Sequence, residues 1–282
     1  ARSMWLNSRG HREQGFVEAQ KAVEIAQPGP EAQRAAQRLV YTCLSRADLT
    51  LGEKAAREAL VHAAKRPELK ARSLRALGVV LVWKQRGEEA IGHFEDLIAL
   101  ARRYGFTARL PIAWHDLGEA LRINGQVSEA RHAYDKAYKT SRSMGLLSAA
   151  ELIRPKLFIC DILEGQLDGV VEKLDAFIPD ATSAGLALAE PFGHMLMAWA
   201  HALAGDIPQA LTVYERVPAM RDMAIDPQYP LMMEQIGRAL ADQEDPRAHT
   251  RAIEALTLAS EFWSRYGQGD RSAQCLRWVK AL

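Results

Sequence analysis

The sequence has little net charge and no long apolar run, and each deficit removes a class of protein from consideration. Its 36 basic residues are balanced by 35 acidic ones, so no global field draws the chain to nucleic acid or to an anionic membrane surface. No stretch has the length of uninterrupted apolar sequence that spans a bilayer, and the N-terminus lacks a basic segment followed by an apolar core. We therefore expect that this segment binds neither nucleic acid nor a membrane.

Cysteine is also scarce. The three cysteines, Cys43, Cys160 and Cys275, lie far apart, and they form neither a CxxC pair nor a dense disulfide framework. A reducing compartment suits such a chain best. We expect the protein to be cytoplasmic.

The short motifs that carry chemistry are missing as well. There is no G-x-S-x-G, no P-loop and no Gly-rich dinucleotide turn. His194 and His201 are seven residues apart and His115 precedes Asp116, but no two histidines have the i, i+4 spacing, with a carboxylate partner, of a helical zinc site. The sequence thus predicts no enzymatic activity, no metal site and no cofactor.

What the sequence does contain is a repeat built from strong helix formers. Small residues recur at intervals of 40, each followed four positions later by a large apolar or aromatic residue on the same helical face. The small positions are Ala90, Ala130, Val170 and Ala210, and the large ones are Phe94, Tyr134, Leu174 and Tyr214. Twelve residues before the small position lie Gly78 and Gly118, which suit a close approach between two helices. The pattern predicts an all-α chain of paired helices.

Glycines punctuate this pattern. Gly105, Gly145, Gly185 and Gly267 each follow an apparent helix, and each stands beside an apolar residue or a tyrosine. Glycine readily adopts the left-handed conformation that ends a helix. We expect helices to end at these four positions.

One copy of the repeat resembles the tetratricopeptide repeat, a helix-turn-helix unit. The matching residues, in order, are Trp114, Leu117, Gly118, Leu121, Gly125, Ala130, Tyr134 and Ala137, with Leu121 in place of the expected Tyr. The resemblance implies a right-handed superhelical solenoid of six to seven antiparallel helix pairs over residues 1–282, with a capping helix near 269–281. The 40-residue period is similar to that of the longer repeats in large bacterial signalling and regulatory proteins. Because the first residue is Ala rather than Met, we expect a piece of a larger protein.

In this family the first helices of the units line a concave binding face, which implies a set of partner-binding residues here. Their positions in three of the copies are Arg72, Arg75, Val79, Val82, Trp83, Ile112, His115, Glu119, Arg122, Ile123, Phe192, Met195 and Trp199. Aromatic and apolar anchors with a few Arg suit an amphipathic helix or an extended peptide. The alternative is that Trp83 and Trp199 are core residues, because Trp is commonly buried whatever its function. Val79 and Glu119 stand where a chaperone-type carboxylate clamp needs polar donors, so that clamp is not expected.

Two functions follow as hypotheses from the resemblance. The first is a non-catalytic scaffold that binds a protein or peptide partner on its concave face, an inference by analogy with the fold. The alternative is the effector-sensing regulatory domain of a bacterial ATPase-linked transcription activator or a kinase or cyclase fusion, with a small-molecule effector. Self-association is a further expectation, because open helical arrays expose apolar end faces unless they are capped.

Overall fold

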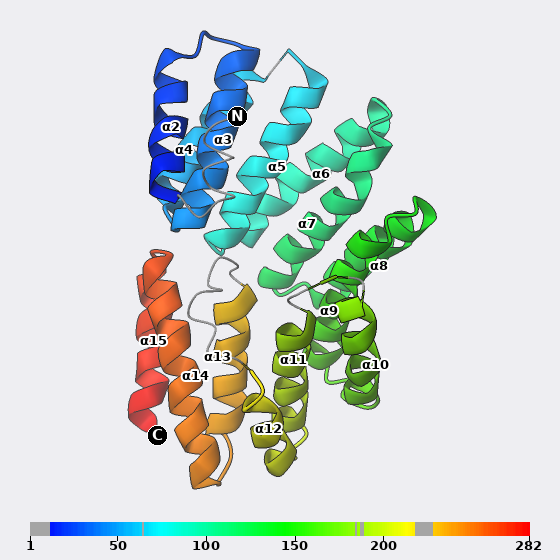
Figure 1. Cartoon of the computed structure of the whole chain (residues 1–282), viewed down its shortest axis with the longest axis vertical. Helices are drawn as coiled ribbons and strands as arrows, with labels where there is room; N and C mark the ends of the chain where they lie inside the picture. The colour runs from blue at the N-terminus through cyan, green and yellow to red at the C-terminus, as the bar shows by residue number, and fades with distance from the viewer. Residues whose placement is uncertain (1–11, 64, 184, 187–188, 218–227) are drawn as a thin grey trace. The chain divides into compact units, whose positions relative to one another are not determined.

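The computed structural model describes residues 12–63, 65–183, 185–186, 189–217 and 228–282, and every regular element within these ranges is a helix (Figure 1). The all-α prediction is therefore confirmed. The chain divides into two compact units, residues 1–140 and 141–282, and the division falls in the last turn of one helix. Each unit is described by itself below. The prediction of one continuous domain stays a prediction.

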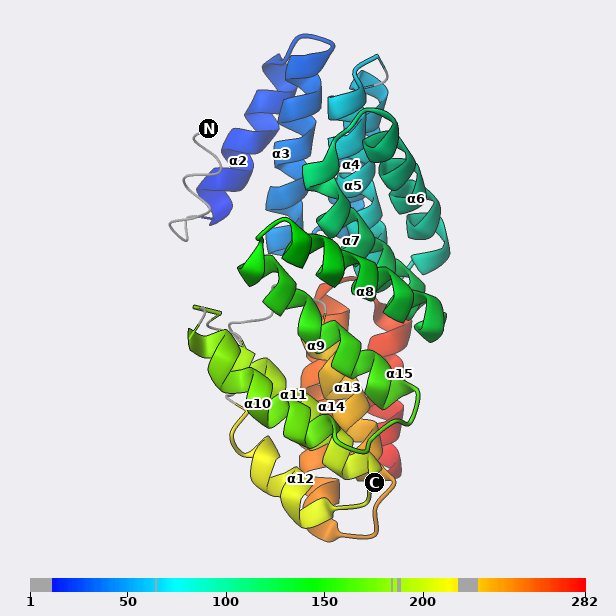
Figure 2. The same cartoon turned by 90° about the vertical axis from the view of Figure 1, so that its right-hand side faces the viewer.

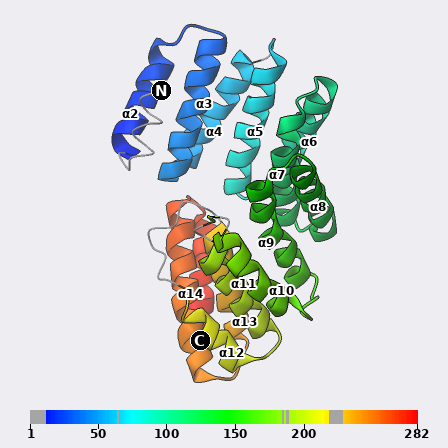
Figure 3. The ribbon, with the colours of Figure 1, turned by 45° about the vertical axis from the view of Figure 1, so that its right-hand side comes forward.

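Unit 1 is built from antiparallel helix pairs in which consecutive helices pack against each other. Its elements are α2 (Arg12–Ile25), α3 (Pro30–Arg46), α4 (Leu49–His62), α5 (Pro67–Trp83), α6 (Gly87–Arg103), the 3-10 turn η1 (Thr107–Arg109), α7 (Leu110–Ile123) and α8 (Val127–Ser143). The first helices of successive pairs, α3, α5 and α7, also contact one another, so they form a layer beside the second helices (Figure 3). This layer carries the predicted binding residues of unit 1.

Unit 2 continues the same alternation. Its helices are α9 (Leu147–Leu163), α10 (Val170–Ser183), α11 (Ala189–Leu203), α12 (Ile207–Tyr214), α13 (Gln228–Ala241), α14 (Pro246–Arg265) and α15 (Gly269–Ala281). Helix α11 packs on α10, α12 and α13 (Figure 2), while α14 lies between α13 and α15 (Figure 1). Helix α15 occupies the range in which a capping helix is expected.

The helix ends follow a regular interval of 20 residues. From position 85 to position 205 every twentieth residue has a positive φ, and these residues are Gln85, Gly105, Gly125, Gly145, Gly165, Gly185 and Gly205. The next N–H reaches back five residues, as when Gln126 N donates to the Leu121 carbonyl at 2.9 Å. This is the Schellman arrangement that satisfies the last carbonyls of a helix. The predicted stops at Gly105, Gly145, Gly185 and Gly267 are confirmed.

The small and large residues of the repeat lie in the core, as predicted. Ala90, Phe94, Ala130 and Tyr134 are all fully buried. Phe94 packs over Gly78 and Tyr134 packs over Gly118, so closely that an added Cβ would lie 2.6 Å and 2.5 Å from the respective rings. The glycines therefore permit the close approach of the two helices of each pair.

The C-terminal helices of unit 2 are joined by a buried polar cluster. The Trp263 indole Nε1 donates to Glu234 Oε2 at 2.8 Å, and Arg271 Nε donates to the same oxygen at 2.8 Å. The Arg271 guanidinium also lies 4.2 Å from the centre of the Trp263 ring. Trp263, on α14, thereby contacts both α13 and α15. Trp263 and Arg271, near the C-terminus, are therefore structural residues of this cluster.

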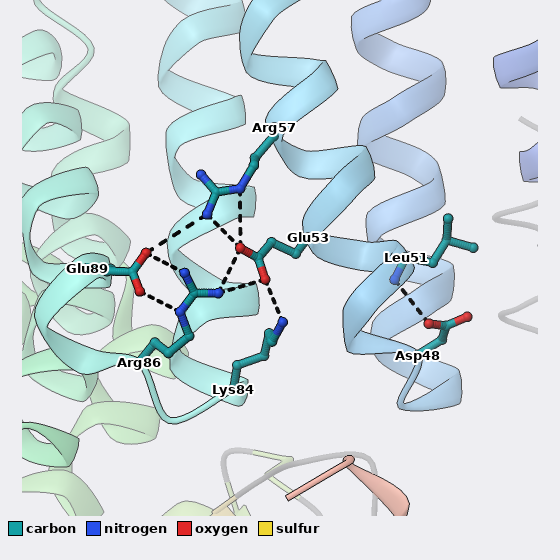
Figure 4. A network of polar contacts seen from close by, with 7 residues as sticks. All are labelled: Asp48, Leu51, Glu53, Arg57, Lys84, Arg86 and Glu89. Carbon is teal, nitrogen blue, oxygen red and sulfur yellow. Dashed lines mark hydrogen bonds and ion pairs between the residues drawn. The ribbon is translucent and has the colours of Figure 1, made fainter.

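Successive pairs of unit 1 are also tied by an ionic network centred on Glu53 of α4 (Figure 4). Glu53 accepts from Arg57 Nη2 at 2.6 Å, from Lys84 Nζ at 2.6 Å and from Arg86 Nη1 at 2.8 Å. Arg86 also pairs with Glu89 of α6. Burial opposes the charged carboxylate, but the hydrogen bonds from Lys84, Arg57 and Arg86 outweigh it and lower the pKa of Glu53 from 4.5 to about 2. The network links the end of α5 to both neighbouring helices.

This network predicts an acid-sensitive contribution to stability. Because the folded pKa of Glu53 lies below its unfolded value, the contribution is present above pH 4.5 and is lost as the pH falls towards 2. We expect Glu53→Gln to lower the free energy of unfolding by about 1–2 kcal/mol at pH 7, since its partners are partly exposed and screened. Urea unfolding at pH 7 and pH 3 measures the difference. Glu89→Gln, at the exposed edge of the network, is the control, and an equal loss at both pH values would contradict the assignment.

Candidate partner-binding face

The first helices of unit 1 present a polar face on the side that the helix pairs do not use for packing. We define this first-helix face by Tyr41 on α3, Arg72, Arg75 and Val79 on α5, Arg109 in η1, and Ile112, His115 and Asp116 on α7. Arg72, Tyr41 and Ile112 are exposed, and Arg75, Val79, Arg109 and His115 are half-buried. The face is accessible because three of the eight residues are exposed, and it is polar because four of them carry charge.

An ion pair joins two helices across this face. Arg75 Nε on α5 lies 2.6 Å from Asp116 Oδ2 on α7, and the other oxygen of Asp116 lies 3.1 Å from His115 Nδ1. Burial opposes the charge on Arg75, but Asp116 and Tyr41 outweigh it and raise the pKa of the guanidinium. The charge of Asp116 is therefore engaged inside the protein.

Positive charge gathers at the edge of the same face. The pKa of Arg109 is lowered, first by burial and then by the nearby charge of Arg72, with a further contribution from Arg75 and an opposing one from Glu68. Within the described residues Arg72 forms no ion pair, and it is exposed. The three guanidinium groups thus lie within reach of one another's charge, with Arg72 open to a ligand.

Glu119 and Arg122, by contrast, form a buried structural group. Tyr134 donates its hydroxyl to Glu119 Oε1 at 2.8 Å, and Arg122 Nη2 donates to Glu119 Oε2 at 2.8 Å. Burial disfavours the charge on Arg122, but Glu119 and Tyr134 outweigh it and raise the pKa of Arg122. These contacts hold α7 against α8. The two predicted binding residues therefore have packing partners that account for them.

The other predicted residues differ in their accessibility. Val82 is buried, and Trp83 and Ile123 are half-buried at the ends of their helices. In unit 2 Phe192 is half-buried, whereas Met195 and Trp199 are only 1% and 4% exposed. Trp199 thus fits the alternative of a core residue. Exposed apolar residues on α9 and α11 include Leu147, Leu152, Leu163 and Leu203.

Tyr41, Arg109 and Asp116 were not among the predicted residues. Tyr41 belongs to α3, whose pair lies outside the 40-residue register, and Arg109 lies in a 3-10 turn where helical spacing gives no direction. Asp116 adjoins His115, but sequence alone does not reveal that it faces Arg75, 41 residues earlier.

In the described part of the chain no group of three or more His, Cys, Asp or Glu side chains is placed to hold a metal ion. None of the described helices is long and apolar enough to cross a membrane.

Comparison with known proteins supports the repeat at the level of sequence. A family model described as tetratricopeptide repeat matches residues 69–143, which include most of α5 and all of α6, α7 and α8. No curated protein matches the sequence. The likeness to the longer repeats of bacterial signalling proteins stays a prediction.

Solved structures support the fold over a longer stretch. The apo form of RapI has a TM-score of 0.71 and 11% identity, covering 100% of this chain and 97% of RapI. A Rap protein complexed with Competence and Sporulation Factor has a TM-score of 0.62 and 15% identity, covering 99% of this chain and 72% of the other. The human IFIT1 dimer with m7Gppp-AAAA has a TM-score of 0.52 and 15% identity, with 96% and 68% covered. At these identities the likeness concerns the fold alone. Residues 69–143 therefore match the tetratricopeptide repeat family, and the likeness to solved helical-repeat structures extends through the rest of the described chain.

Proposed function

We propose that this chain is a non-catalytic scaffold that binds a peptide or protein segment on the first-helix face of unit 1. The observation that carries the proposal is the set of accessible side chains there, chiefly Arg72, Arg109 and Ile112, that the packing of the helix pairs does not require. Arginines beside apolar side chains are typical of surfaces that recognise peptides. In the family the equivalent helices line the concave side of the array. By analogy, we propose that the first-helix face is the binding face of this chain.

The charge of the face selects the partner. Asp116 is engaged by Arg75 and His115, so Arg72 remains open to an incoming anion. A guanidinium group binds a carboxylate through paired hydrogen bonds. The preferred partner is therefore a segment with an Asp or Glu side chain next to an apolar one that contacts Ile112. The Rap structure complexed with Competence and Sporulation Factor supports such a use of this fold.

We expect Arg72→Glu to weaken binding of a fluorescein-labelled acidic-apolar decapeptide at least about tenfold. Fluorescence anisotropy at two salt concentrations measures the affinity, and the effect should shrink at high salt because the contact is exposed. Lys54→Glu is the matched control, since Lys54 is an exposed cation on the second helix α4. Equal weakening by both variants would contradict the site.

The same protein samples test the alternative function. A sugar, nucleotide or amino acid that raises Tm, in the absence of any peptide binding, would favour an effector-sensing domain. Light scattering at two concentrations tests self-association.

We propose a cytoplasmic location, which suits the three buried, unbridged cysteines.

A further inference from the structure

A groove in the surface of unit 1 lies between α6 and α8, over α7. Its volume is about 500 Å³, within the range of ligand sites. The groove is lined by Ile91, Glu95, Trp114, Leu117, Leu121, Gln126, Ser128, Glu129, His132 and Ala133. Both walls and the floor come from unit 1.

This groove is separate from the first-helix face. On α7 it uses Trp114, Leu117 and Leu121, which recur at helical spacing along one stripe. Ile112 and His115, which belong to the first-helix face, point to the other side of the helix at roughly 100° per residue. One helix thus contributes to two surfaces, and a ligand on one does not touch the other.

The floor of the groove is apolar and includes an incompletely covered indole. Leu117, Leu121 and Ala133 are buried, whereas Trp114 is half-buried. Lys136 Nζ and the Arg102 guanidinium lie 4.4 Å and 5.3 Å from the centre of the Trp114 ring. These cation–π contacts fix the ring. A fixed, partly exposed aromatic ring is a good anchor for an apolar side chain of a ligand.

The rim of the groove is acidic. Glu95 on α6 and Glu129 on α8 are exposed, and within the described chain neither has an ion-pair partner. The carboxylates stand on opposite walls and repel an anion there, while the cations Lys136 and Arg102 lie over the Trp114 ring below them. The sign of the rim is therefore opposite to that of the first-helix face.

Helix α6 leaves its backbone uncovered beside this rim. Gly92 precedes Glu95 by three residues, and a Cβ added there would meet nothing within 4 Å. Glycine inside a helix costs about 1 kcal/mol relative to alanine, and no neighbour in unit 1 requires its small size. The bare backbone permits close approach of another chain.

We propose that this groove binds a basic-apolar segment of a partner protein, with a bulky apolar side chain against the exposed part of the Trp114 indole and flanking Lys or Arg side chains at Glu95 and Glu129. The apolar floor supplies the contact area, and the two unpaired carboxylates supply the selectivity for cations. This site is additional to the first-helix face. Together the two surfaces let one unit bind two segments of opposite charge.

The test uses the full chain with a reporter in the groove. All three native cysteines are buried, so His132→Cys, at an exposed lining residue, provides an accessible thiol for an environment-sensitive dye. The probe is the acetylated heptapeptide Lys-Lys-Leu-Trp-Leu-Lys-Lys, and its counterpart carries Glu in place of Lys. We expect the basic peptide to change the dye emission saturably and the acidic peptide to leave it unchanged.

Charge reversal then separates this site from the proposed one. Glu95→Lys with Glu129→Lys should weaken the basic peptide at least about tenfold. Glu172→Lys with Glu261→Lys, at two exposed carboxylates of unit 2, makes the same change in net charge and should leave the affinity within about twofold. Arg72→Glu should affect only the acidic-apolar peptide. Equal loss in both double variants, or no response to the basic peptide at millimolar concentration, would overturn the groove site while leaving the first-helix face untouched.

Discussion

Replacing Gly118 with alanine is expected to lower the free energy of unfolding of unit 1 by about 2–3 kcal/mol. The new Cβ would lie 2.5 Å from Cε1 and 2.6 Å from Cδ1 of Tyr134. The Tyr134 ring cannot turn aside without cost, because it is fully buried and its hydroxyl donates to Glu119. Either α7 moves away from α8 or the hydrogen bond is lost. Urea unfolding followed by circular dichroism gives the change.

Gly92→Ala is the matched control for this experiment. Gly92 also lies inside a helix, but its added Cβ would meet nothing within 4 Å. Alanine should therefore stabilise the helix by about 0.5–1 kcal/mol, as the propensity difference requires. Gly78→Ala, whose Cβ would lie 2.6 Å from the Phe94 ring, should behave like Gly118→Ala. If Gly118→Ala and Gly92→Ala shift the urea midpoint in the same direction, the close-approach role of Gly118 is wrong.

Replacing Glu119 with leucine should destabilise the protein by about 3–5 kcal/mol, the range for breaking a buried ion pair on one side. The change leaves the Arg122 guanidinium and the Tyr134 hydroxyl without the carboxylate that accepts from both. Both groups are largely shielded from water, so solvent replaces the lost bonds poorly. Thermal and urea unfolding measure the loss.

A compensating variant tests the cause. Glu119→Leu combined with Arg122→Met and Tyr134→Phe removes every member of the group, and an apolar replacement of a buried ion pair is often neutral. We expect the triple variant to recover most of the stability lost by Glu119→Leu alone. A triple variant at least as unstable as the single one would show that the loss comes from packing rather than from unpaired polar groups.

The parts of the fold that follow from spacing could be predicted from the sequence. The pairs Ala90–Phe94 and Ala130–Tyr134 are buried because residues four apart share one side of a helix. Gly118 was assigned to a close approach, and it lies directly beneath Tyr134. These features depend on a local period and on residue size, both of which are visible in one sequence.

The exposure of the binding positions could not be predicted in the same way. Val79, Glu119 and Trp199 occupy equivalent places 40 and 80 residues apart, yet Val79 is half-buried while Glu119 and Trp199 are buried. The 40-residue period indicates which side of the helix a residue occupies. How much of that side is buried depends on the neighbouring helix, which the period does not describe. Glu119 is covered because Tyr134 and Arg122 both bind it.

The cationic edge of the first-helix face escaped prediction for a related reason. Arg72 and Arg75 were predicted on α5, but Arg109 comes from the separate turn η1, and only the assembly of the two segments brings the three charges together. The groove over Trp114 depends likewise on the separation of α6 and α8, which no residue spacing encodes.

The 20-residue interval between left-handed residues has a consequence for the ancestry of the chain. Gln85 and Gly125 end successive first helices with the same backbone turn, so the 40 residues between them form a module whose two ends match. Excising or copying such a module joins one left-handed turn to another and keeps the later helices facing the same neighbours. Unequal recombination can thus lengthen or shorten the array in whole modules.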